Sequence, residues 1–199
     1  YESEALGLHK IFRQHGVRSV LDASFGYGVH LFPLSRLGYE CTGIDTSDAM
    51  LRLGKEKAAR EGLNIEFIKC DIGDIKLEKQ FDAIICLYRF AFIIKENDLK
   101  KALRNMHGAL NSDGILALSV MNREFESLTP VGMPTLFIDI AEEGDIKVIR
   151  LSSTQYRENI QDRCAAFLVE DHGKASILIY RDKMLLSTLD YITKILKDC

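Results

Sequence analysis

The stretch Val20-Leu-Asp-Ala-Ser-Phe-Gly-Tyr-Gly28 decides how this chain folds. Together with the preceding Ser19, its first residues up to Ala23 have the composition of a short buried strand. Its second part carries Gly26 and Gly28, which can adopt backbone conformations that bring main-chain N–H groups close to a ligand. A helix is expected to follow from His30 to Leu37. A strand, a glycine turn and a helix in this order begin a parallel α/β sheet.

Helix-like and strand-like segments alternate from residue 1 to about 121, which is the pattern of an α/β domain. A first helix is expected to end at Gly16. Further strands are predicted at Tyr39–Asp45, Asn64–Cys70, Phe81–Leu87 and Ile115–Met121, and further helices from Ser47 as N-cap to about Arg60 and at Asp98–Leu110. The sequence therefore predicts a doubly wound, mostly parallel sheet.

After Asn122 the sequence becomes rich in β-strand patterns. Two prolines, Pro130 and Pro134, bracket a loop. Four strands are predicted at Thr135–Ile140, Ile146–Ser152, Arg163–Glu170 and Ala175–Tyr180, with a hairpin turn at His172-Gly173 and a closing helix at about Ser187–Lys197. We interpret 1–121 as a cofactor-binding domain, 122–182 as a small antiparallel insertion after the fifth strand that covers one end of the sheet, and 183–199 as the closing helix of the main domain.

Composition narrows the class of protein. The chain has 199 residues and a net charge of −3, from 26 basic and 29 acidic residues, which disfavours nucleic-acid binding. No apolar run reaches the roughly 18 to 20 residues that a membrane-spanning helix needs. Five cysteines form no CxxC pair, which favours reduced thiols, and they show no metal-ligand spacing. We expect a soluble cytoplasmic protein without a metal site.

Two carboxylates near the glycine turn indicate the ligand. Asp45 closes the second predicted strand, 17 residues after Gly28, where a carboxylate can bind both hydroxyls of a ribose. Asp22 stands beside the turn, where it would repel the phosphates of a dinucleotide, and Leu31 occupies the place of that motif's third glycine. A nucleoside cofactor with an ammonium and a sulfonium but no phosphate fits better. S-adenosylmethionine is such a cofactor.

At this point the sequence resembles the Rossmann-like, class I S-adenosylmethionine-dependent methyltransferases, in particular the small-molecule branch with glycine and sugar-amine N-methyltransferases. The resemblance covers about residues 1–121 and rests on spaced motifs: DASFGYG at 22–28, GYECTGIDTSDAML at 38–51, CDI at 70–72 and FDAIICL at 81–87. It implies that Asp22, Ser24, Gly26 and Gly28 line the methionine part, Asp45 the ribose, Thr46 and Met50 the adenine face, Asp71 and Ile72 the adenine edge, and Leu87 the ammonium.

Departures from the family pattern concern three places. The family usually has a glycine at Ser24 and a small residue at Tyr27, so this loop is bulkier. Arg89 occupies a place often held by a small polar residue beside the transferred methyl group, where it could clamp an acidic substrate or block a pocket. The family fold also continues for two more strands beyond Cys199. Either the C-terminal part was lost or this is a five-stranded variant, and we favour loss.

The most consistent function is methyl transfer to a small-molecule acceptor, with an amine slightly favoured over a hydroxyl because no general base is evident. Tyr88 and Arg89 follow the fourth strand, where open α/β sheets bind ligands, and are the candidate catalytic residues. His30 and His172 are expected to face solvent. Two alternatives stay open: a catalytically idle S-adenosylmethionine-binding protein and, less favoured, a nicotinamide-dependent oxidoreductase. Neither a nucleic-acid nor a membrane partner is expected, and the oligomeric state is open.

Overall fold

The computed structural model describes residues 1–93, 95–122, 135–157 and 159–198. These residues form two compact units. The first contains residues 1–90, 95–119 and the last residues of the chain, and the second is made mainly of residues 120–195. The elements of the first unit are α1 (Glu2–Gln14), β1 (Ser19–Asp22), α2 (Leu31–Arg36), β2 (Glu40–Asp45), α3 (Asp48–Glu61), β3 (Ile65–Lys69), β4 (Phe81–Cys86), α4 (Glu96–Gly108) and β5 (Leu110–Leu118).

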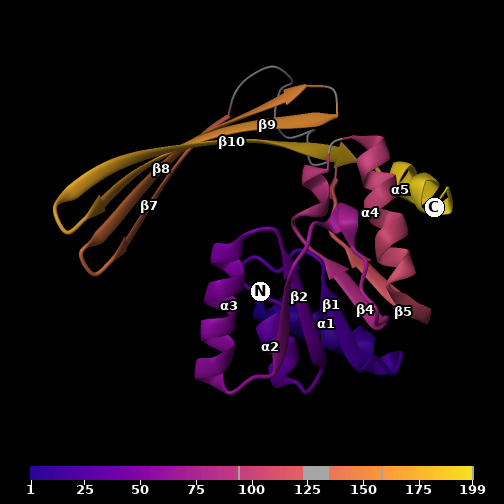
Figure 1. The fold of residues 1–199 in the computed structure, drawn as a ribbon. Helices are drawn as coiled ribbons and strands as arrows, with labels where there is room; N and C mark the ends of the chain where they lie inside the picture. The colour runs from indigo at the N-terminus through magenta and orange to yellow at the C-terminus, as the bar shows by residue number, and fades with distance from the viewer. Residues whose placement is uncertain (94, 123–134, 158, 199) are drawn as a thin grey trace. The chain divides into compact units, whose positions relative to one another are not determined.

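The first unit contains a five-stranded sheet in the order β3-β2-β1-β4-β5, and all its neighbouring strands run parallel (Figure 1). The strands are apolar on both faces: Val20 and Ile85 belong to the core cluster with α1 and α2 residues such as Phe12 and Phe32, and Leu21 is equally buried. This arrangement confirms the predicted doubly wound α/β fold. It places the reversal of strand order between β1 and β4.

Local signals in the sequence explain the limits of α3. The Ser47 side chain accepts a hydrogen bond from the backbone N–H of Met50, as an N-cap does. Gly62 ends the helix with φ +66°, the left-handed conformation that glycine adopts without strain. In α4, the inward positions Leu99 and Met106 are fully buried, as their spacing predicts.

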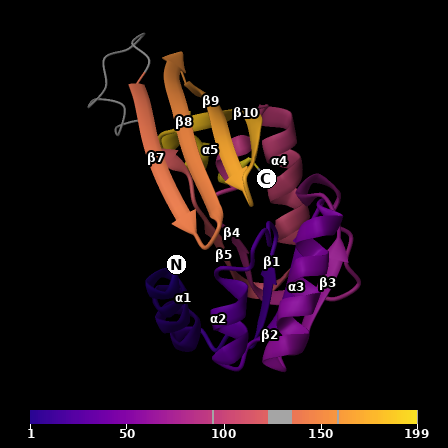
Figure 2. The same cartoon turned by 90° about the vertical axis from the view of Figure 1, so that its left-hand side faces the viewer.

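The second unit holds β6 (Met121–Asn122), β7 (Thr135–Glu143), β8 (Ile146–Arg157), β9 (Ile160–Asp171), β10 (Lys174–Ser187) and most of α5 (Leu189–Lys197). Strands β7 to β10 form antiparallel neighbours, side by side in Figure 2. His172 and Gly173, both with positive φ, form the two-residue turn between β9 and β10. The antiparallel strands and this hairpin confirm the predicted β-rich region.

The structure corrects the predicted end of the fifth strand. The parallel strand ends at Leu118, while Met121 pairs with Leu186 of β10 in the second sheet. The strands of the second sheet are also longer than predicted, and β10 continues past residue 182 to Ser187. The predicted loop bracketed by Pro130 and Pro134 lies outside the described residues. The division of the chain at residues 121 and 182 stays a prediction.

Among the described residues, no helix is long and apolar enough to cross a membrane.

Candidate functional site

The loop that follows β1 is anchored to both neighbouring strands. The backbone N–H of Ala23 donates to the carbonyl of Ile85 in β4, at 2.8 Å, and that of Phe25 donates to the carbonyl of Ile44 in β2, at 2.9 Å. The loop therefore lies at the carboxyl ends of β1, β2 and β4. Because the strand order reverses between β1 and β4, this is where open α/β sheets bind their ligands.

The side chain of Phe25 fixes the shape of this loop. It is 3% exposed, and its ring packs edge-on against Phe32 of α2 and Phe67 of β3, with centroids 5.9 and 5.0 Å apart. Glycines make room for the ring: a Cβ atom would lie only 2.4 Å from it at Gly28 and 2.7 Å from it at Gly54. Gly28 of the loop and Gly54 of α3 thus both serve the packing of Phe25.

Asp45 joins the glycine turn to the end of β2. Its Oδ2 accepts a hydrogen bond from the backbone N–H of Gly26, and its Oδ1 accepts one from Ser47, both at 2.8 Å. Each carboxylate oxygen has a second lone pair. The Asp45 carboxylate can therefore hold the turn and still accept hydrogen bonds from two ligand hydroxyls.

Asp22 is a buried carboxyl at the end of β1. It is 3% exposed, and its Oδ1 accepts a hydrogen bond from the backbone N–H of Ser24 at 3.0 Å. Burial raises the pKa of Asp22 to about 7, and the nearby negative charge of Asp45 adds to this increase. Two carboxyl groups of the same charge thus stand close to the glycine turn. A cationic group placed beside them would favour the ionised form of Asp22.

Hydrogen bonds join several of the predicted cofactor residues to one another or to their neighbours. The Ser24 hydroxyl donates to the carbonyl of Leu87 after β4, at 3.4 Å, which links the loops that follow β1 and β4. Cys70, after β3, donates its N–H to the carbonyl of Asp45 at 3.1 Å. Asp71 follows directly, and its Oδ1 accepts from Gly73 at 2.7 Å.

The remaining predicted residues lie near the ends of β2, β3 and β4. Thr46 is exposed next to Asp45, Met50 is half-buried in the first turn of α3, and Ile72 begins a short 3-10 helix (Ile72–Asp74). Arg89 is exposed, two residues beyond Leu87. Tyr27, the bulky residue of the loop, is 69% exposed and belongs to the loop's outer surface.

Tyr88 has a strained backbone conformation, and its side chain belongs to a network with Glu4 and His30, which are distant from it in the sequence. Its φ is +65°, which is unfavourable for a bulky residue. Its hydroxyl donates to Oε1 of Glu4 at 2.5 Å, and its ring stacks on His30 with centroids 5.9 Å apart. His30 in turn bonds Oε2 of Glu4 through Nε2, at 2.8 Å. Helix α1 is thereby joined to the loops that follow β1 and β4.

This network corrects the expected exposure of His30 and narrows the chemical role that Tyr88 can have. His30 is only 4% exposed, so the prediction that it faces solvent is wrong. His172, by contrast, is exposed at its hairpin turn, as predicted. The hydrogen bond to Glu4 raises the pKa of Tyr88 to about 12, which keeps the phenol protonated at neutral pH. Tyr88 therefore keeps its single hydroxyl proton in the bond to Glu4 and is unsuited to accept a substrate proton.

Replacement of Tyr88 by phenylalanine tests this network. The same hydrogen bond is the largest cause that lowers the pKa of Glu4, followed by the bond to His30. In Tyr88→Phe we expect the pKa of Glu4 to rise toward its ordinary value, measured as the midpoint of its side-chain carboxyl ¹³C shift in an NMR titration. Tyr39→Phe is the control, because the Tyr39 hydroxyl bonds His9 instead. An unchanged Glu4 midpoint in Tyr88→Phe would contradict the assigned bond.

Comparison with known proteins adds to this geometry. A family model described as a methyltransferase domain matches residues 20–114. A glycine/sarcosine N-methyltransferase from Aphanothece halophytica is 33% identical over 116 residues, which are 57% of this chain and 44% of that protein. This chain thus spans less than half the length of that relative.

Solved structures show the same fold over nearly the whole chain. A sugar N-methyltransferase from a Streptoalloteichus species has a TM-score of 0.85 at 23% identity, covering 98% of this chain and 77% of that one. An S-adenosylmethionine-dependent methyltransferase from Clostridium acetobutylicum has a TM-score of 0.83 at 19% identity, covering 97% and 77%. These findings confirm the resemblance drawn from the motifs. Residues 20–114 match a methyltransferase domain, and the chain has the Rossmann-like fold found in solved S-adenosylmethionine-dependent methyltransferases.

Proposed function

We propose that this chain binds S-adenosylmethionine at the carboxyl ends of β1, β2 and β4 and transfers its methyl group to an amine on a small molecule. The observation that carries this proposal is the pair of carboxyl groups, Asp22 and Asp45, around the glycine turn. One is buried and the other shapes the turn. The matched methyltransferase domain includes both residues.

The residues fit this cofactor in charge and in hydrogen bonding. Asp22 is buried, and the like charge of Asp45 raises its pKa further, so a ligand ammonium would compensate both carboxyl groups. The free lone pairs of Asp45 suit the two hydroxyls of a ribose. A dinucleotide would bring phosphates to the same carboxylates and be repelled.

Bound at this site, the cofactor would supply a methyl group already activated by a sulfonium. The protein then has to align the acceptor nucleophile with that methyl group, at about 3 Å, and exclude water. Tyr88 and Arg89, directly after Leu87, are the side chains proposed to contact the acceptor. Tyr88 is held rigidly by Glu4 and His30, which suits an orienting role.

An amine acceptor agrees with the titration properties of the site. A neutral amine needs no strong base to attack a sulfonium methyl group, whereas a hydroxyl needs one. The raised pKa of Tyr88 leaves its phenol protonated, and His30 is engaged with Glu4. The relative from Aphanothece halophytica methylates the nitrogen of glycine and sarcosine by its name, which supports the same reaction type here.

Calorimetry with S-adenosylmethionine, S-adenosylhomocysteine and NAD tests the proposal. We expect both adenosyl ligands to bind and NAD not to bind. Asp45→Ala should weaken binding by roughly tenfold to a hundredfold, because two charge-assisted hydrogen bonds to the ribose are lost. Asp48→Ala is the matched control. Asp48 is an exposed carboxylate at the start of α3, close to Asp45 in sequence, and it pairs with Lys69 of β3.

Each other outcome is informative. Binding of NAD in place of the adenosyl ligands would favour the oxidoreductase alternative. Binding of S-adenosylmethionine without turnover of any amine in a panel that includes glycine and amino sugars would favour the idle binding protein. An unchanged affinity in Asp45→Ala would contradict the assignment of the ribose site.

A further inference from the structure

A pocket of about 410 Å³ lies on one face of the second sheet, inside the second unit. The strand register explains it. Ser152 of β8 and Ala165 of β9 lie directly opposite each other, and their small side chains form a floor. Phe137 pairs with Ser152 on one side, and Tyr180 pairs with Ala165 on the other. Directly opposed residues share a face of the sheet, so two half-exposed rings flank the floor.

One end of the pocket carries a polar group whose bonding is incomplete. Gln161 lines the pocket and is 8% exposed. Its Nε2 donates to the hydroxyl of Tyr156 at 3.0 Å, but its Oε1 is buried and has no hydrogen-bond partner among the described residues. Turning the amide does not remove the problem, because the Tyr156 hydroxyl can pair with only one end of it. Buried polar groups are rarely left unpaired, so an unpaired acceptor in a pocket wall points to a ligand that donates to it.

The charges around the pocket are balanced. Arg163 forms a two-point ion pair with Asp182, whose side chain is 7% exposed. Arg150 is also paired, since its Nε and Nη2 both donate to Oδ2 of Asp139. Each guanidinium that lines the pocket thus has its own carboxylate. An anion would meet neutralised guanidinium groups and be repelled by their carboxylates, whereas a neutral ligand would not.

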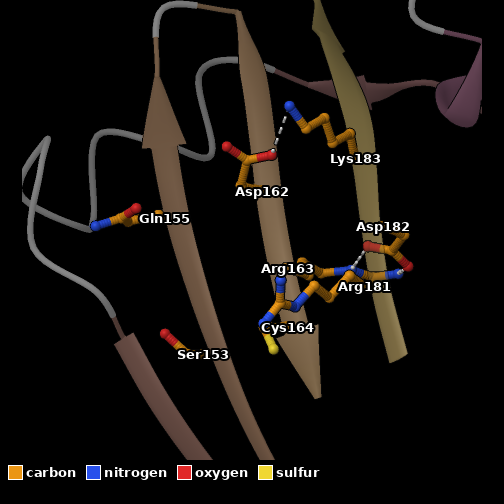
Figure 3. A pocket seen from close by; sticks show the side chains of 8 residues that line it. All are labelled: Ser153, Gln155, Asp162, Arg163, Cys164, Arg181, Asp182 and Lys183. Atoms are coloured by element: carbon orange, nitrogen blue, oxygen red, sulfur yellow. Dashed lines mark hydrogen bonds and ion pairs between the residues drawn. The ribbon is translucent and has the colours of Figure 1, made fainter. Parts of the chain in front are cut away.

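The opposite face of the sheet differs in this respect. Figure 3 shows its smaller pocket, of about 290 Å³, with Cys164, Arg181 and the ion pair between Asp162 and Lys183. No buried side-chain atom without a partner was found there among the described residues. The features that call for a ligand are confined to the face with Gln161.

We propose that the pocket with Gln161, which we call the sheet pocket, binds a small neutral molecule with a ring and with hydroxyl or amine donors. The ring would lie on the floor of Ser152 and Ala165, between the rings of Phe137 and Tyr180. A hydroxyl or amine of the ligand donates to Gln161. Such a ligand is either part of the methyl acceptor or a separate molecule. The binding site itself does not depend on the proposed methyl transfer.

The test uses the full chain and p-aminophenyl β-D-glucopyranoside, a neutral molecule with a ring, hydroxyls and an amine. Two-dimensional ¹H–¹⁵N NMR at millimolar probe should show shifts at Thr154, Gln161 and Ala165. The matched probe p-aminophenyl phosphate, in which a charged group replaces the sugar, should produce none of these shifts. An absence of shifts with the glucoside, or equal shifts with the phosphate, would overturn the proposal.

Substitutions locate the binding. Ala165→Phe fills the floor and should weaken glucoside binding by about tenfold or more, whereas Ala166→Phe makes the same change on the other face and should not. Gln161→Leu should also weaken binding, while its thermal unfolding temperature stays equal or rises because an unpaired buried acceptor is removed. Unchanged glucoside binding in either pocket variant that folds normally would overturn the proposal, so the test stands even if the other variant fails to fold.

A second arm separates the two sources of ligand. The glucoside is incubated with the protein and S-adenosylmethionine, and mass spectrometry shows whether its amine is methylated. Methylation that is lost in Ala165→Phe identifies the sheet pocket as an acceptor site. Binding without methylation identifies a site for a separate ligand. Failure of cofactor binding would count against the proposed function alone, because the NMR experiment needs no cofactor.

Discussion

Asp22→Asn is expected to weaken S-adenosylmethionine binding by roughly tenfold to a hundredfold and, at the same time, to stabilise the free protein. Asparagine can still accept the hydrogen bond from Ser24, but it carries no charge to balance the cofactor's ammonium. The free protein gains because it no longer has to bury a carboxylate. Since the folded pKa lies about three units above its ordinary value, the gain above pH 7 is roughly 2–4 kcal/mol. Calorimetry and thermal unfolding measure the two effects.

The gain in stability expected for Asp22→Asn depends on pH. Between about pH 4 and pH 7 the folded chain binds a proton at Asp22 that the unfolded chain has released, so the contribution of Asp22 to stability falls as pH rises. The advantage of Asp22→Asn should therefore be small near pH 4, grow up to pH 7 and stay constant above. A cationic cofactor lowers the pKa of Asp22 and should release protons when it binds near pH 7.

Asp82→Asn is the control with the opposite expectation. Its Oδ2 accepts hydrogen bonds from Arg18 and Ser19 at the amino ends of the strands, and these bonds help to hold the pKa of Asp82 low despite partial burial. Loss of that carboxylate should destabilise the protein by about 1–3 kcal/mol and leave cofactor affinity unchanged. If Asp22→Asn were the less stable of the two at pH 8, the raised pKa of Asp22 would be wrong.

Local signals in the sequence predicted the order of strands and helices in the first unit and several of their boundaries. The glycine turn, the N-cap Ser47 and the C-terminal Gly62 mark boundaries through interactions between residues close in sequence. The apolar runs of β1 and β4 are those of strands buried on both faces. The predicted ligand residues are drawn together because parallel strands end at the same edge of a sheet, so Asp22, Asp45 and Leu87 could be grouped from strand order alone.

Features that depend on distant residues could not be found this way. Glu4 lies 26 residues from His30 and 84 from Tyr88, and no periodicity links a first-helix carboxylate to two loop residues. The length of β10 was underestimated because only its last four residues, Met184 to Ser187, are buried, and such a short buried segment does not show that the exposed strand before it continues. The role of Phe25 was also missed, since its sequence neighbours suggest a ligand-facing loop rather than a core anchor.

Gly28→Ala and Gly26→Ala should have clearly different effects on stability, although both change a glycine with positive φ in the same loop. Each variant incurs the left-handed strain of a residue with a Cβ, about 1–2 kcal/mol. At Gly28 the added Cβ also meets the rings of Phe25 and Phe32 at 2.4 and 2.7 Å. Overpacking there adds about 1–3 kcal/mol. We expect a total loss of about 2–5 kcal/mol for Gly28→Ala, measured by denaturant unfolding.

Gly26→Ala is the matched control, because the nearest atom to its added Cβ would be the Ser24 carbonyl oxygen at 3.9 Å. It should lose only the strain of about 1–2 kcal/mol. The neighbouring rings also predict a partial rescue: Phe25→Leu removes the nearer of the two rings that the new Cβ meets, so Gly28→Ala should cost less in that background than alone. Equal losses for the two alanine variants, or additive losses for Gly28→Ala and Phe25→Leu, would show that backbone strain and not the Phe25 ring requires the glycine. In that case the turn, and not packing against Phe25, would determine the shape of the loop. Substitutions in the loop could then change its affinity for ligand without disturbing the core.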